Sequence, residues 1–159
     1  MEKKISAIPE GFNTLSSYIS VNDAKAAIEF YKTAFGAKET GRINMPDGSV
    51  AHAELQIGDS KIMLAEENPQ WGNQSPRTLG GSPVTLCIYV DDVDSVFQKA
   101  LQAGAKTTGD MDVKDQFYGD RAGSLTDPFG HKWSIMTHKE DVSFEEMQKR
   151  MDAMFSVYK

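Results

Sequence analysis

His52 and Glu54 are the residues of this chain whose types and spacing most readily support chemistry. They stand two positions apart in a run of alternating apolar and polar residues, which predicts a strand with both side chains on one face. A carboxylate beside an imidazole can raise the imidazole pKa and orient its proton. The pair is a candidate general base, part of a metal site with His138, or a polar anchor for a ligand. The alternative is a hydrogen-bonded polar pair with no further role.

A second candidate group lies in the polar and aromatic loop at residues 115–121. Phe117 and Tyr118 offer two aromatic faces, and Arg121 offers a guanidinium group, a combination suited to planar or anionic ligands. The alternative is a hairpin loop in which Asp120 and Arg121 make only surface contacts, worth about 0–1 kcal/mol.

The elements that must position these residues occur twice in the chain. Ile19–Asp23 matches Ile88–Asp92, so that Val21 answers Val90 at an offset of 69 residues. Each copy predicts a strand that runs into a helix, with Asn22 and Asp91 as the N-caps. Gly36 and Gly104 are predicted to end the two helices in a left-handed conformation.

The order of elements predicts two βαβββ modules of class α+β. Strands are expected at 15–21, 38–45, 50–57, 61–66, 84–90, 107–113, 122–126 and 131–138, and helices at 23–35, 93–103 and beyond Ser143. The predicted boundaries are 12–67 for the first module, 68–83 for an irregular linker, 84–140 for the second module and 141–159 for a C-terminal helix. Ser143 and Glu146 form a capping-box pattern at the start of that helix.

Alternation along the strands predicts which face of the first sheet is polar. If Gly58 and Asp59 form a two-residue turn, Glu54 lies opposite Met63 on the neighbouring strand. The apolar side of the sheet must then carry the helix. His52, Glu54 and Met63 share the other, polar side.

Composition excludes several classes of partner. With 17 basic and 23 acidic residues the net charge is −6, which disfavours nucleic acid and anionic membrane surfaces. No stretch approaches the ~18 apolar residues of a membrane helix, and the N-terminus lacks the apolar core of a signal peptide. The single cysteine, Cys87, suits a reducing cytoplasm. We therefore expect a cytoplasmic protein.

The order and spacing of these motifs resemble the glyoxalase/bleomycin-resistance/dioxygenase superfamily, also called vicinal oxygen chelate. The resemblance rests on Val21–Asp23 before the first helix, Phe30–Gly36 at its end and Asp127–His131 before the last strand. It implies two curved mixed sheets that enclose a cup, with the helices outside, and a homodimer. The second half looks closest to an uncharacterised bacterial subgroup, through stretches such as Leu79–Pro83.

The resemblance also implies where metal-dependent members hold their ion. The matching positions in this chain are occupied by Ser16, Met63, Thr85 and Ser134. Hydroxyls and a thioether bind Zn²⁺, Ni²⁺ or Fe²⁺ far less well than imidazole or carboxylate does. We therefore expect no metal cofactor, the alternative being a divalent metal held elsewhere.

The sequence accordingly predicts a metal-free protein that binds or sequesters a small organic molecule in the cup. The predicted ligand-binding residues are His52, Glu54, Met63, Phe117, Tyr118 and Arg121. The alternative function is a lyase, isomerase or dioxygenase of the same superfamily that acts on a small oxygenated substrate.

Overall fold

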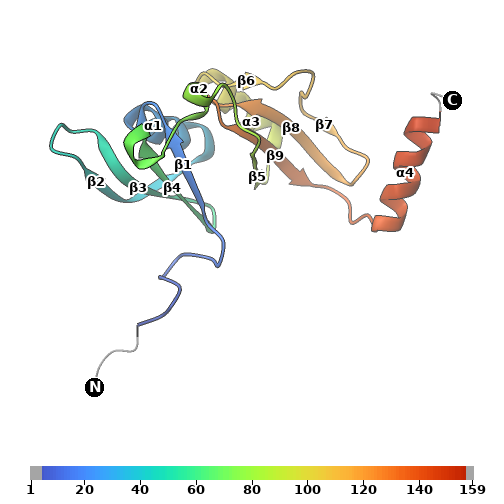
Figure 1. The fold of residues 1–159 in the computed structure, drawn as a ribbon. Helices are drawn as coiled ribbons and strands as arrows, with labels where there is room; N and C mark the ends of the chain where they lie inside the picture. Colours follow the sequence, from blue (N-terminus) through green and yellow to red (C-terminus); the bar gives the residue numbers. More distant parts are fainter. Residues whose placement is uncertain (1–4, 157–159) are drawn as a thin grey trace. The chain divides into compact units, whose positions relative to one another are not determined.

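The computed structural model describes residues 5–156. It contains two successive groups of strands and helices (Figure 1). The first group is β1 (Ser17–Val21), α1 (Ala24–Phe35), β2 (Lys38–Asn44), β3 (Val50–Ile57), β4 (Ser60–Glu66), η1 (Pro69–Trp71) and α2 (Pro76–Leu79). The second is β5 (Thr85–Tyr89), α3 (Val93–Gln102), β6 (Lys106–Thr107), β7 (Lys114–Asp115), β8 (Asp120–Thr126), β9 (Lys132–His138) and α4 (Phe144–Ser156).

The chain divides into two compact units, each built on one mixed sheet. The first unit contains the described residues up to Ser82 together with Pro128–Gly130, and the second contains the remainder. The first sheet has the order β1-β4-β3-β2, in which only β1 and β4 are parallel. The second has the order β5-β9-β8-β6, with β5 parallel to β9 and with β7 also paired to β8. The predicted α+β class with two βαβββ-like modules is confirmed.

The register of the first sheet confirms the prediction from alternation. Glu54 pairs with Met63 and Ile57 with Ser60 across the hairpin of β3 and β4. Ala53 and Leu55, which flank Glu54 in the strand and point to the other face of the sheet, are buried. That buried face packs against α1, whose inward residues include Ile28 and Tyr31. The polar face of the first sheet is therefore the face that α1 leaves open.

The second sheet repeats this arrangement with α3. Leu125, Trp133 and Ile135 are buried on the α3 side of the sheet. Gly123 lies on the same side and allows Phe97 of α3 to approach, because an added Cβ would lie 2.8 Å from the Phe97 ring. The opposite, polar face carries side chains two apart on β5, namely Thr85, Cys87 and Tyr89, all of which are exposed.

The predicted N-caps are wrong by one residue in both modules. The side chain of Asp23 accepts from the Ala26 N–H, and that of Asp92 accepts from the Ser95 N–H, so Asp23 and Asp92 are the caps. Asn22 and Asp91 precede them, and the buried Oδ1 of Asn22 has no hydrogen-bond partner among the described residues. Two adjacent Asx residues give the same signal, and the residue immediately before the helix takes the role, because its side chain reaches the N–H of the third helical residue.

Two further predictions about secondary structure need correction. The strand expected at 107–113 is limited to β6, after which Gly109 adopts a φ of 56° and the chain turns away before β7. The linker at 68–83 is not wholly irregular, since it contains η1 and α2. Both short helices follow an Asn or Ser cap and have proline in the first turn, a pattern typical of helix starts.

The two modules satisfy the first N–H of their helices in the same way. In the first unit, the Ala24 N–H donates to Glu66 Oε2 at 2.9 Å. In the second, the Val93 N–H donates to Thr137 Oγ1 at 2.9 Å. Glu66 ends β4 and Thr137 is the next-to-last residue of β9, so both acceptors come from the strand parallel to the one that precedes the helix.

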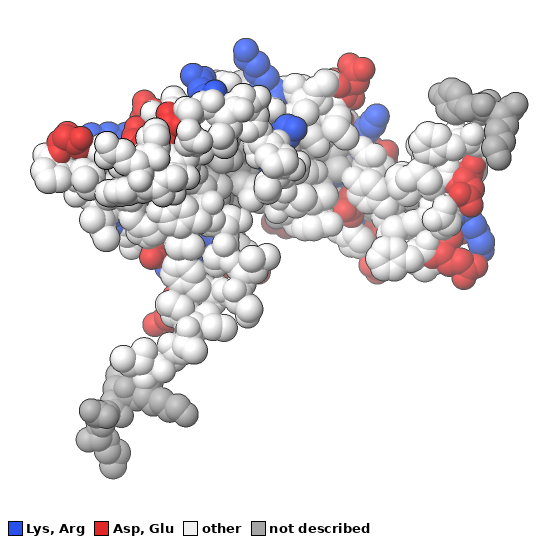
Figure 2. Space-filling view, in the orientation of Figure 1, with Lys and Arg blue, Asp and Glu red and all other residues white. Residues whose placement is uncertain are grey.

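The C-terminal helix α4 begins at the predicted capping residue. The Ser143 hydroxyl accepts from the Glu146 N–H at 3.2 Å. None of the described α4 side chains is buried, and Met154 and Phe155 are more than half exposed. Figure 2 shows charged side chains on this helix beside uncoloured ones. Arg150 connects it to the rest of the second unit by donating to the Phe117 carbonyl and to Glu140. Over the described residues, no helix has the length and apolarity needed to cross a membrane.

Candidate functional site

The structure brings His52, Glu54 and Met63 together on the polar face of the first unit. His52 Nε2 lies 3.7 Å from Glu54 Oε1. Tyr18 of β1 pairs with Met63, and its ring lies 5.7 Å from the His52 ring, between centroids. The sheet pairing therefore places an aromatic ring, an imidazole, a carboxylate and a thioether on one open surface.

Lys61 forms an ion pair with Glu54 on this surface. Its ammonium group donates to Glu54 Oε2 at 2.8 Å and lies 4.4 Å from the centroid of the Phe12 ring. The hydrogen bond from Lys61 is the largest cause of a lowered Glu54 pKa, and His52 adds a smaller contribution. Glu54 is thus held as a carboxylate, which can orient His52 but is a poor proton donor at neutral pH.

The other three predicted site residues lie in the second unit and divide between two places. Phe117 and Tyr118 pack edge to face, with ring centroids 5.2 Å apart. Arg121 points elsewhere: its guanidinium group donates to Asp94 of α3 and to Asp115. It pairs with Thr137, whose hydroxyl caps α3, so Arg121 lies on the helix side of the sheet and Phe117 and Tyr118 form a separate pair.

A hydrogen-bonded group on the polar face of the second unit was not predicted as a site. Asp120 is only 5% exposed, so the alternative interpretation, in which it makes only surface contacts, does not hold for this residue. Its Oδ2 accepts from the Tyr89 hydroxyl at 2.9 Å, and its Oδ1 lies 2.7 Å from His138 Nδ1. The other ring nitrogen of His138 lies 2.9 Å from Asp141 Oδ1. Both contacts are hydrogen bonds only when both nitrogens carry protons, because carboxylates accept and do not donate.

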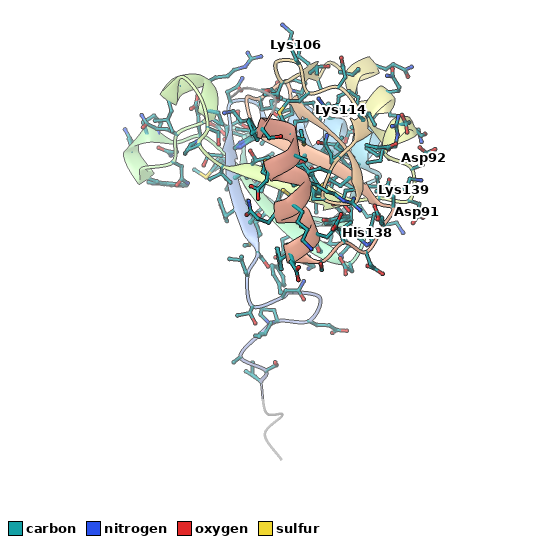
Figure 3. The ribbon with its side chains drawn as sticks, turned by 90° about the vertical axis from the view of Figure 1, so that its right-hand side faces the viewer. Asp91, Asp92, Lys106, Lys114, His138 and Lys139 are labelled. Carbon is teal, nitrogen blue, oxygen red and sulfur yellow. The ribbon has the colours of Figure 1, made fainter. Side chains whose placement is uncertain are left out.

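A pocket of about 440 Å³ opens beside this group. It is lined by Tyr89, Val90, Asp91, Thr137 and His138. Figure 3 labels Asp91 and His138 at this end of the second unit, and it shows Lys106 and Lys114 well away from them. The pocket forms where β5 and β9 end side by side and the chain turns into α3, so sheet pairing and the helix start together fix its walls.

Asp120 also perturbs the tyrosines near it. The hydrogen bond to Asp120 is the largest cause of a raised pKa for Tyr89. The pKa of Tyr118 is raised mainly by burial and then by the charge of Asp120. Both phenols therefore stay protonated at neutral pH and act as hydrogen-bond donors. Alternation on β5 could have indicated Tyr89, because it lies two residues beyond Cys87 on the same face, but nothing local indicated that Asp120 is buried.

The first unit lacks this group at the equivalent positions. Ile19 and Leu64 of β1 and β4 correspond to Ile88 and Ile135 of β5 and β9, because each pair is in register. By the same pairing Ala53 corresponds to Gly123, and Val50 therefore to Asp120. Val50 is fully buried. A βαβββ module can therefore accommodate an apolar residue at this place, as the first unit does.

His138 should make the stability of the protein depend on pH. Asp120 and then Asp141 raise its pKa above the ordinary value, while the Tyr89 hydroxyl faces the same carboxylate. A raised folded-state pKa adds stability that is fully present below the unfolded pKa of about 6.5 and is lost as pH rises through the folded value. We expect the melting temperature of the parent to exceed that of His138→Gln more at about pH 6 than at about pH 8.5. A difference that grows with pH would contradict this assignment.

Metal ligation requires three or more suitable donors around one point. Over residues 5–156, His, Cys, Asp and Glu side chains form no group of three or more that could hold a metal ion. Met63 is paired with Glu54 and Tyr18, Thr85 with Lys132, and Ser134 with Cys87, so the neighbouring strands add one carboxylate and one thiol to those positions.

Comparison with known proteins identifies relatives of the whole fold. The sequence profile of the "Glyoxalase/Bleomycin resistance protein/Dioxygenase superfamily" matches residues 11–135. An uncharacterised protein of Mycobacterium bovis is 44% identical over 142 residues, which cover 87% of this chain and 92% of that protein.

Two crystal structures show the same fold. A gene product of Arabidopsis thaliana is 29% identical, with a TM-score of 0.60 over 78% of this chain and 98% of that one. A "glyoxalase/bleomycin resistance protein/dioxygenase family enzyme" of Burkholderia phytofirmans is 23% identical, with a TM-score of 0.61 over 77% and 96% of the two chains.

Proposed function

Because this chain belongs to the glyoxalase/bleomycin resistance protein/dioxygenase superfamily, we propose that it binds a small organic molecule without a metal cofactor. The observation that carries the proposal is the 440 Å³ pocket of the second unit. Its volume falls in the range of pockets that hold small molecules, roughly 300–1,000 Å³. An aromatic ring, an imidazole and the Asp91 carboxylate line it, and Asp120 holds the Tyr89 and His138 side chains, which gives the mixture of apolar and polar groups that such sites use.

The predicted residues remain part of the proposal. Phe117 and Tyr118 lie in the same unit, in the turn immediately before Asp120, and contribute two aromatic rings. His52, Glu54 and Met63 contribute a second open polar surface on the first unit. Arg121 contributes indirectly, by fixing Asp94 and Asp115, because its guanidinium group donates hydrogen bonds to both.

An enzyme is the second candidate, and the contact of His52 with Glu54 favours it. Glu54 has a lowered pKa and is therefore a carboxylate, and its Oε1 lies 3.7 Å from His52 Nε2. It can orient the imidazole, so that His52 acts as the base of a lyase or isomerase. His52→Ala should then abolish turnover of a 2-oxoaldehyde–thiol adduct without loss of folding. If no such adduct is turned over by the parent protein, binding alone remains.

A thermal-shift screen of aromatic and charged metabolites and drugs tests the binding proposal. A compound that binds the native state raises its melting temperature. We expect Tyr89→Ala to weaken binding of the hits about tenfold or more, since it removes the aromatic wall of the pocket. Asp110→Asn, at an exposed turn residue, is the control and should leave binding unchanged. Hits whose affinity survives both Tyr89→Ala and Glu54→Gln would contradict the proposal.

The proposal predicts that the purified protein carries no stoichiometric transition metal. Adding Ni²⁺, Zn²⁺ or Fe²⁺ should not raise its melting temperature, because Ser16, Met63, Thr85 and Ser134 are weak donors for these ions. Elemental analysis is the measurement. About one metal ion per chain, lost on replacing His52 by Ala, would overturn the prediction.

We also infer that the protein is a homodimer in which α4 contributes to the contact. Its Met154 and Phe155 are exposed apolar side chains, of a kind that dimer contacts commonly cover. Light scattering at micromolar concentration should give twice the monomer mass of 17.6 kDa for the parent. Met154→Lys with Phe155→Lys should shift the protein toward monomer, whereas Asp152→Lys on the same helix should not. A monomeric parent with α4 intact would contradict the inference.

A further inference from the structure

We propose that the pocket of the second unit selects small organic cations, such as aryl-alkyl ammonium compounds. This rests on the proposed binding function and goes further by assigning the charge and hydrogen-bonding character of the molecule that binds. The side-chain donors of the pocket are already used within the protein, whereas acceptors remain unused.

The donors of the pocket side chains are all committed within the protein. Both ring nitrogens of His138 face carboxylates, at 2.7 Å from Asp120 and 2.9 Å from Asp141. The Tyr89 hydroxyl donates to Asp120 Oδ2. The Thr137 hydroxyl donates to the Val90 carbonyl at 2.8 Å. An anion that entered the pocket would have to break one of these bonds to gain a donor.

Two donors at the start of α3 are committed as well. A helix N-terminus can bind an anion through its free N–H groups. Here the Val93 N–H donates to Thr137 Oγ1, and the Ser95 N–H donates to the Asp92 side chain. Two of the groups that would face an anion are therefore occupied, and the capping carboxylate of Asp92 adds a repulsive charge.

Carboxylate acceptors at the pocket, by contrast, remain without a full set of hydrogen bonds. Over the described residues, the exposed Asp91 carboxylate of the pocket wall has no hydrogen-bond or ion-pair partner. Asp141 uses only Oδ1 on His138 and is fully exposed. With a doubly protonated His138, the carboxylates of Asp91, Asp120 and Asp141 leave the group with a formal charge of −2.

The basic residues of the second unit do not reverse this balance. Arg121 is bound to Asp94 and Asp115. Lys139 follows His138 and is labelled beside Asp91 in Figure 3, and its charge also helps to lower the Asp94 carboxyl pKa. Counting its charge still leaves the group with a formal charge of −1. Lys106 and Lys114 lie well apart from the pocket in Figure 3.

The aromatic wall completes the selection. The Tyr89 side chain is held by its hydroxyl, while 64% of the residue is exposed. A tyrosine ring attracts a cation over its face, and it also contacts the apolar body of an aryl compound. A molecule with an ammonium group on a short aryl-alkyl chain can reach Asp91 with its charge and Tyr89 with its ring.

Three probes of nearly equal shape test the proposal: benzylamine, benzyl alcohol and benzoate, titrated into isotopically labelled protein at neutral pH. Amide signals of residues 89–92 and 137–138 report occupation of the pocket. We expect benzylamine to shift them at the lowest concentration, benzyl alcohol to bind more weakly and benzoate to bind least. Asp91→Asn should weaken benzylamine binding about fivefold, because a neutral amide replaces a charged acceptor. It should leave benzyl alcohol unchanged, and Asp110→Asn should leave both unchanged.

Different results would overturn the cation preference and the binding function. If benzoate or benzyl alcohol shifts these signals at lower concentration than benzylamine does, the cation preference is wrong and the binding function stands. If Asp91→Asn leaves benzylamine affinity unaltered, Asp91 is not the acceptor and the proposal is likewise overturned. If none of the three probes shifts these signals at millimolar concentration, the pocket fails as a binding site and both the preference and its premise fall.

Discussion

Replacing Gly119 by alanine should lower the free energy of unfolding by about 2–5 kcal/mol, the largest loss that we expect from a single added methyl group in this chain. Gly119 has a φ of 100°, which L residues rarely adopt. An added Cβ would also meet the backbone oxygen of Glu140 and lie 2.8 Å from Val142 Cγ2. The backbone oxygen cannot move aside easily, because the Gly119 carbonyl accepts from the N–H groups of Lys139 and Glu140 and fixes that segment.

Gly36→Ala is the matched control for this prediction. Gly36 has a φ of 66°, but nothing lies within 4 Å of the Cβ that would be added. It should therefore cost only the left-handed conformation, about 1–2 kcal/mol. Denaturant unfolding of the two variants measures the difference. Equal losses in the two would show that the close approach of residues 119 and 140 contributes nothing to stability.

Asp120→Ala should lower the free energy of unfolding by about 2–3 kcal/mol. This is less than the usual cost of breaking a fully buried ion pair, because the two groups bonded to Asp120, Tyr89 and His138, are partly exposed. The change removes the acceptor of the Tyr89 hydroxyl and of His138, and it leaves space behind them. Tyr89 and the His138 side chain are 64% and 53% exposed, so each can turn toward water and recover part of the loss.

Asp120→Val separates the stability of the fold from the role of the carboxylate. Val50 fills the equivalent place in the first unit and is fully buried. We therefore expect valine at position 120 to recover at least half of the stability lost in Asp120→Ala, while the Tyr89 and His138 side chains lose their common acceptor. Chemical denaturation gives the stability, and the histidine ring signals of nuclear magnetic resonance report the His138 environment. Valine as damaging as alanine would mean that the second unit depends on the carboxylate for folding.

The parts of the fold that depend on local pattern could be predicted from the sequence. Alternation in β3 and β4 was enough to place Glu54 opposite Met63, because a two-residue turn leaves one register that buries the apolar face. The repeat of Ile19–Asp23 in Ile88–Asp92 indicated two equivalent modules, because both copies carry the strand, the cap and the helix start. The exact capping residue was missed, since two adjacent Asx residues carry the same signal.

The candidate site of the second unit depends on contacts that no local pattern contains. Asp120 lies 31 positions from Tyr89 and 18 from His138, so its burial depends on the pairing of three strands. Read locally, it belongs to a polar loop beside Arg121, a context typical of surface residues. The sequence likewise could not show which groups Arg121 meets, because its ion-pair partner Asp94 in the structure comes from α3, 27 positions away.

Glu66 and Thr137 occupy the same place in the two modules and serve the same backbone donor with different oxygen atoms. The helix start therefore requires an acceptor there and tolerates either a carboxylate or a hydroxyl group. A chain built from a duplicated module can diverge at such a position in single steps, each of which still folds. The substitution of one acceptor for another changes the charge at the edge of one sheet by one unit, so the two halves of the chain can evolve different electrostatic environments while their backbones stay alike.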